Sequence, residues 1–154
     1  MRRLLIAIIF TLTQLVTSSS AQSTELGLLI LEIGFNRNSD SSAREFTVMN
    51  IENKKYVVHH DPIHHPMVAE VEEGIYCVYS LKYSDNTDFE YCGEPYFKVL
   101  GGKINNAGFW KFKLDRTTWS VDSAFQNLAE TLAHAKSYDA TDAALIEKYS
   151  HAVP

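Results

Sequence analysis

The chain is poor in cysteine and in long apolar runs, and both shortages limit what it can be. It has 154 residues and two cysteines, Cys77 and Cys92. A lipid-bearing cysteine of the bacterial lipoprotein kind is therefore not expected, because none follows the N-terminal apolar run directly. Beyond that run, no segment has the roughly 20 consecutive apolar residues that a membrane-spanning helix needs. We expect a protein that is neither membrane-spanning nor lipid-anchored.

Positive charge is also scarce. The chain has 14 Lys and Arg against 19 Asp and Glu, a formal net charge of −5. Loss of residues 1–21 would remove Arg2 and Arg3 and no acid, which leaves −7. Binding of nucleic-acid phosphates needs concentrated Lys and Arg. We therefore expect no nucleic-acid partner.

The N-terminal segment has the layout of a secretory signal peptide. Arg2 and Arg3 precede an apolar run over residues 4–10, which fades into small and polar residues. Ser19 and Ala21 place small side chains at positions −3 and −1 of a cut before Gln22. We predict cleavage there and a soluble protein that is periplasmic or secreted. The remaining residues, 22–154, suit one domain with one core.

The two cysteines of an exported chain predict a disulfide bond. Turn residues around 84–87 lie between two strand-like segments, and a symmetric hairpin there would place Cys77 opposite Cys92. That register puts Glu90 and Glu94 on the face of apolar residues. We therefore expect a bulge or an early strand end near Gly93 and Pro95.

Short apolar and β-branched segments between residues 25 and 114 predict about seven or eight strands. Glu52–Lys54 is expected to form a tight hairpin turn, and Gly108 to mark a bulge or a close backbone approach. The character changes after residue 120. Val121, Phe125, Leu128 and Leu132 recur at helical spacing. A second short helix is predicted over residues 143–149, capped by residues 139–142. We predict a mainly β chain, an antiparallel β-sandwich with two C-terminal helices over about 121–149.

A group of turn glycines and strand residues between positions 73 and 108 carries a resemblance to known proteins: Glu73, Gly74, Tyr76, Phe97, Val99, Gly102, Lys103, Ile104 and Gly108. This part of the chain, about fifty residues, resembles small bacterial secreted or envelope proteins of unknown function, whose β-sandwich is transthyretin-like or carboxypeptidase-regulatory-like. The resemblance implies a fold but no catalytic residues, because such modules generally bind or support.

Four of the six histidines lie in the segment HHDPIHHP, residues 59–66. Zinc takes three or four nitrogen, sulfur or oxygen ligands, and His60, Asp61, His64 and His65 could supply them. Two prolines, however, make the segment a loop rather than a strand, so its ligands are not preorganised. A zinc site is one interpretation, and a polar loop without a cofactor is the other.

Aromatic residues are concentrated between positions 76 and 119, and strand alternation points about half of them away from a core. Such residues could form a carbohydrate or protein platform, or the C-terminal helices could cover them. We expect the helices to cover them, since the apolar stripe of the first helix needs a partner. The residues concerned are Tyr76, Tyr79, Tyr91, Tyr96, Phe97, Phe109, Trp110, Phe112 and Trp119.

Catalytic motifs are weak. No serine lies in a G-x-S-x-G elbow, and Glu70, Glu72 and Glu73 are neighbours at the end of a strand rather than an opposed pair. We therefore expect an exported, non-enzymatic binding module of the bacterial envelope, with a protein or envelope component as its partner. The alternatives are a metal-binding protein that uses the His59–His65 loop and a periplasmic inhibitor or immunity protein.

Overall fold

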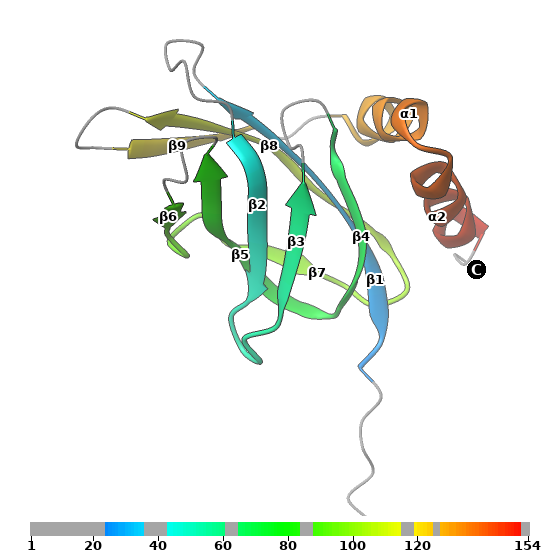
Figure 1. Ribbon diagram of the computed structural model, residues 1–154. Helices are drawn as coiled ribbons and strands as arrows, with labels where there is room; N and C mark the ends of the chain where they lie inside the picture. The colour runs from blue at the N-terminus through cyan, green and yellow to red at the C-terminus, as the bar shows by residue number, and fades with distance from the viewer. Residues whose placement is uncertain are drawn as a thin grey trace, which may run out of the picture.

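The computed structural model describes residues 24–35, 43–60, 65–83, 88–114, 119–124 and 127–151. The expected signal peptide lies outside these residues. The described chain is mainly β, with two helices at its C-terminal end (Figure 1). Its elements are β1 (Leu26–Phe35), β2 (Ala43–Asn50), β3 (Tyr56–His60), β4 (Met67–Glu72), β5 (Gly74–Tyr83), β6 (Asp88–Glu90), β7 (Phe97–Val99), β8 (Ile104–Leu114), β9 (Trp119–Ala124), α1 (Leu128–Tyr138) and α2 (Ala140–His151).

The strands form two sheets. One has the order β4-β1-β8-β9, and the other has the order β3-β2-β5-β6, with β7 also paired to β5. All the pairs are antiparallel except β1 with β8, which run parallel. The expectation of seven or eight strands in a wholly antiparallel arrangement is therefore corrected to nine described strands with one parallel pair.

The apolar run of β1 explains its central place. Leu29 and Leu31 point into a core shared with the other sheet, which contributes Phe46, Val48 and Tyr76 among others. Leu28 and Ile30 belong to a second cluster beneath the helices. A strand that is buried on both faces has a continuous run of apolar residues in its sequence, whereas a strand buried on one face alternates apolar and polar residues.

The two helices lie against the outer face of the first sheet (Figure 1). Ala135, Ile146 and Tyr149 pack there with Leu28 and Ile30, so the helices cover aliphatic side chains. No described aromatic residue of positions 76–119 belongs to this cluster, so the expectation that the helices cover the outward-facing aromatic residues is wrong. Tyr76, Trp110 and Phe112 lie in the core between the sheets, with Phe97 packed beside them.

The helical region begins later than predicted. Residues 119–124 form β9, and α1 starts at Leu128, where the Asn127 side chain accepts a hydrogen bond from the Ala129 amide at 2.9 Å. Val121 lies opposite Phe112 and packs against the core. Val121 is therefore in a strand because pairing with β8 buries it, and this burial outweighs the helical spacing of the apolar residues. Phe125 lies outside the described residues.

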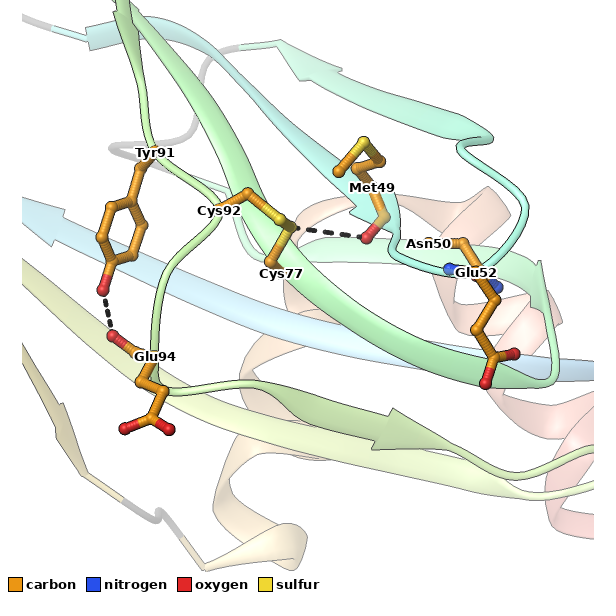
Figure 2. Close-up of a disulfide and its surroundings, with 7 residues drawn as sticks. All are labelled: Met49, Asn50, Glu52, Cys77, Tyr91, Cys92 and Glu94. Atoms are coloured by element: carbon orange, nitrogen blue, oxygen red, sulfur yellow. Dashed lines mark hydrogen bonds between the residues drawn. A yellow bond between two sulfur atoms is a disulfide. The ribbon is translucent and has the colours of Figure 1, made fainter.

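Cys77 and Cys92 are bonded, with a Cα–Cα distance of 5.0 Å (Figure 2). The predicted register was wrong by one residue: Ser80 pairs with Glu90 and Leu81 with Phe89. β6 ends at Glu90, so the early strand end is confirmed, and Cys92 takes a left-handed φ of 53°.

A bulge in β5 explains which side chains of the β5–β6 hairpin face the core. The pairing of β5 with β2 shifts between Val78 and Ser80. Leu81 therefore faces the core together with Val78, and Phe89 packs beside it. With this shift, Glu90 lies opposite Ser80 and not opposite a core residue. The sequence alone places Cys77 and Leu81 on one face because the bulge has no clear local motif.

Candidate functional site

The two described histidines at the end of β3 have different surroundings. The His59 ring centroid lies 5.1 Å from that of the core residue Phe46, and its Nε2 lies 3.0 Å from the His65 carbonyl oxygen. His60 is exposed, and its Nδ1 lies 3.2 Å from a Glu45 carboxylate oxygen on the neighbouring strand. Successive strand residues point to opposite faces, so these two side chains contact different neighbours.

A cavity of about 280 Å³ opens between β3, the start of β4 and the junction of the two helices. We call it the histidine cavity. It brings together segments about 70 residues apart in the sequence, and Figure 1 shows the helices next to β4. Its lining residues are His59, His60, His65, Val68, Tyr138, Asp139 and Asp142.

Tyr138 connects the cavity to the first sheet. The His65 ring meets the Tyr138 ring edge-on at a centroid distance of 4.7 Å. His134 lies one helical turn before Tyr138, with its Nε2 3.1 Å from the tyrosine hydroxyl oxygen and its Nδ1 2.9 Å from Glu32 Oε1. Glu32 is a β1 residue. The position of the Tyr138 ring is thus set from both sides, by the sheet and by the segment before β4.

The two carboxylates of the cavity differ in their environment. The Thr141 backbone amide donates to Asp139 Oδ1 at 2.6 Å, and this hydrogen bond holds the pKa of Asp139 below its ordinary value. Burial raises the pKa of Asp142, and the nearby charge of Asp139 raises it further. A positive charge on His65 would lower the pKa of both carboxyl groups. Among the described residues that line the cavity there is no Lys or Arg, so with neutral imidazoles the charge of this lining is negative.

The structure describes only part of the proposed zinc ligand set. His60 and His65 both line the cavity, whereas Asp61 and His64 lie outside the described residues. Within the described ranges no three His, Cys, Asp or Glu side chains are arranged to hold a metal ion. Zinc binding by the whole loop stays a prediction, because two of its four candidate ligands are not described.

Sequence reasoning did not connect Tyr138, Asp139 or Asp142 with the histidines. It did predict that a second helix follows Asp139, and the structure shows Asp139 capping α2. No spacing rule links residue 65 to residue 142, since their proximity depends on how the helices pack on the sheet. The sequence holds only one hint of this proximity: a histidine-rich segment and a helix that begins with acidic residues occur in the same chain.

Neither helix of the described chain is long and apolar enough to cross a membrane. Comparisons of the chain with protein-family models, with curated proteins and with solved structures give no match.

Proposed function

We propose that this protein is an exported, non-enzymatic binding module with a β-sandwich fold, and that the histidine cavity is its ligand site. The observation that carries the proposal is the convergence of β3, β4 and the helix junction on one open cavity lined by ionisable side chains. Binding sites are typically concave, with a few convergent polar groups that fix the ligand's orientation.

The charge and shape of the cavity favour a cationic group. Asp139 and Asp142 supply negative charge, and the Tyr138 ring, 41% exposed, supplies an aromatic wall. An ammonium group is attracted both by a carboxylate and by the face of an aromatic ring. A lysine side chain on a protein or envelope component has this chemistry, and it agrees with the acidic balance of the chain.

Titration with Nα-acetyl-lysine amide, followed by two-dimensional NMR, tests this function. We expect the amide signals of His65, Asp142 and their neighbours to shift. The Asp142→Asn variant should weaken binding by about tenfold, as loss of one charge-assisted contact predicts. The matched control is Glu147→Gln, because Glu147 is an exposed acid on α2 outside the cavity.

Two further comparisons make the test decisive. Affinity should fall as the pH is lowered, because burial and the charge of Asp139 raise the pKa of Asp142, and protonation of Asp142 removes one negative charge from the cavity. The Nε-acetylated ligand, which has no charge, should bind more weakly. Equal binding of both ligands, or shifts confined to other surfaces, would contradict the proposal.

Zinc is the competing ligand. A rise in melting temperature with micromolar zinc, absent when His60→Ala and His64→Ala are combined, would support the metal-binding alternative instead.

An inhibitor or immunity protein would also bind a partner, and its test is whether the partner is an enzyme that loses activity on binding.

A further inference from the structure

A second concave surface lies on strands that do not line the histidine cavity. It is a groove of about 260 Å³ between β7 of one sheet and β8 and β9 of the other. We call it the edge groove. The lining residues that matter here are Tyr96, Phe97, Lys98, Trp110, Ser123 and Ala124.

The floor of the edge groove is aromatic and fixed in place. Phe97 meets Trp110 edge-on at a centroid distance of 5.6 Å and stacks on Tyr76 at 5.9 Å. Trp110 Nε1 donates to the Ala107 carbonyl oxygen at 2.9 Å, so the indole is satisfied within the fold. The Tyr96 side chain beside this floor is 48% exposed. The groove therefore offers apolar contact without rearrangement of the core.

A bulge in β8 forms part of the groove wall. The pairing of β1 with β8 shifts between Ile30 and Glu32, which confirms the bulge expected near Gly108. Gly108 has a φ of 84°, and its amide donates to Asn106 Oδ1 at 2.9 Å. Bulges are frequent beside functional sites because they redirect neighbouring side chains. Here the bulge lies where Asn106 and Ala107 line the groove.

Two of the three strands that border the groove, β7 and β9, have an edge without a paired strand in the described part of the chain. β9 is the last strand of its sheet, and β7 pairs with β5 alone. Figure 1 shows β9 at the margin of the molecule. Unpaired main-chain N–H and C=O groups on a sheet edge are a template for another strand. Such an edge matches the backbone of an extended peptide, and it does not match a ring-shaped ligand or a helix.

The charge of the groove lining indicates which residue types the bound peptide should contain. Lys98 is the one charged residue among those that line the groove, it is exposed, and no described residue forms an ion pair with it. By contrast, Lys113 on β8 is paired with Asp122 on β9 at 2.5 Å. An acidic residue in the added strand would therefore meet an available cation.

We propose that the edge groove binds an extended segment of a partner protein by strand addition, with an apolar side chain in the groove and an acidic side chain next to Lys98. Main-chain hydrogen bonds to a sheet edge supply affinity in this mode, and pockets for alternate side chains supply specificity. This surface is distinct from the histidine cavity, so either site can be disproved without the other.

The test uses the full mature chain and a synthetic peptide, Ac-Thr-Val-Glu-Val-Thr-NH2, followed by NMR. We expect shifts in β7, β9 and the groove. Methylation of the peptide's backbone nitrogens should weaken binding by at least about tenfold, because it removes the strand hydrogen bonds. The Lys98→Glu variant should not bind this peptide. It should instead bind a second peptide, in which Lys replaces the central Glu.

The matched control is Lys103→Glu, which reverses an exposed lysine outside the groove and should leave binding unchanged. Tyr96→Ala should weaken binding without unfolding the protein, because Tyr96 is half-exposed. The proposal is overturned if millimolar peptide causes no shift at β7 or β9. It is also overturned if the methylated peptide binds equally well, or if Lys98→Glu does not reverse the preference.

Discussion

At the scale of single residues, Glu70 is the main polar link between α2 and the first sheet. Lys148 Nζ and the Tyr149 hydroxyl donate to Glu70 Oε1 at 2.6 and 2.9 Å. The hydrogen bond from Lys148, followed by that from Tyr149, lowers the pKa of Glu70. Burial, together with the hydrogen bond to Glu70, raises the pKa of Tyr149 to about 12. The contact therefore requires an ionised Glu70 and a protonated Tyr149.

Glu70→Gln should lower the free energy of unfolding by about 1 kcal/mol at pH 7, since the contact is partly exposed. A lowered folded-state pKa adds stability that is complete above the ordinary value of 4.5 and is lost as the pH falls through the folded value. Urea unfolding at several pH values should therefore show the two proteins converging below about pH 4. A constant difference down to pH 3 would contradict this assignment.

Asn50 shows how one residue forms a turn. Its side-chain oxygen accepts from the Glu52 and Asn53 amides at 3.0 and 3.3 Å, and its carbonyl accepts from the Lys54 amide at 2.9 Å. Lys54 has a φ of 60°. The tight hairpin predicted over 52–54 is confirmed. The turn was predictable because turn residues act over a short range, whereas the capping role of the Asn50 side chain was not predicted.

At the scale of elements, the bond between Cys77 and Cys92 ties β5 to the segment that follows β6 (Figure 2). Tyr91 donates to the Glu94 carbonyl oxygen in the same segment, and the Cys92 amide donates to the Val78 carbonyl oxygen at 3.1 Å. The pairing of the cysteines was predictable from their number and spacing. Their register was not, because it depends on where β5 bulges.

Replacing both cysteines with serine should lower the free energy of unfolding by about 3 kcal/mol, on the chain-entropy estimate for a loop of this length. Chemical unfolding of the oxidised wild type and the double variant gives this difference. Thiol counting on the unreduced wild type should find no free cysteine. Two free thiols would refute the bond.

The helical pair shows the limit of periodicity as a guide. Val121, Leu128 and Leu132 fit one helical stripe, yet Val121 belongs to β9, and Leu128 is 43% exposed. Leu132 does pack beneath the helices. Short apolar patterns fit a strand or a helix equally, and the choice here depends on whether β8 has a partner on that side.

At the scale of the whole molecule, β1 organises the fold. It lies between β4 and β8, and its side chains reach both the core between the sheets and the cluster under the helices. The helix layer, in contrast, rests on a small cluster and on polar contacts at Glu32 and Glu70. The stability of the two layers should therefore differ.

Native-state hydrogen exchange should reveal this difference. We expect β1 amides to exchange only by global unfolding and amides of α1 and α2 to exchange faster by local opening. Ile146→Ala removes a fully buried side chain from the cluster beneath the helices. It should accelerate exchange in the helices more than in β1. Equal protection of β1 and α1 in the wild type would contradict the layered view.

Local patterning and composition were enough to predict the mainly β character, the C-terminal helices, the cysteine pair and the hairpin over residues 52–54. The sequence also supplies the prediction of export, which rests on residues 1–21. Three features depend on long-range packing: β1 and β8 run parallel, β9 replaces the start of a helix, and His65 contacts Tyr138 in a cavity that Asp142 also lines. Contacts between residues so far apart in the chain follow from how the layers pack, and no local pattern records them.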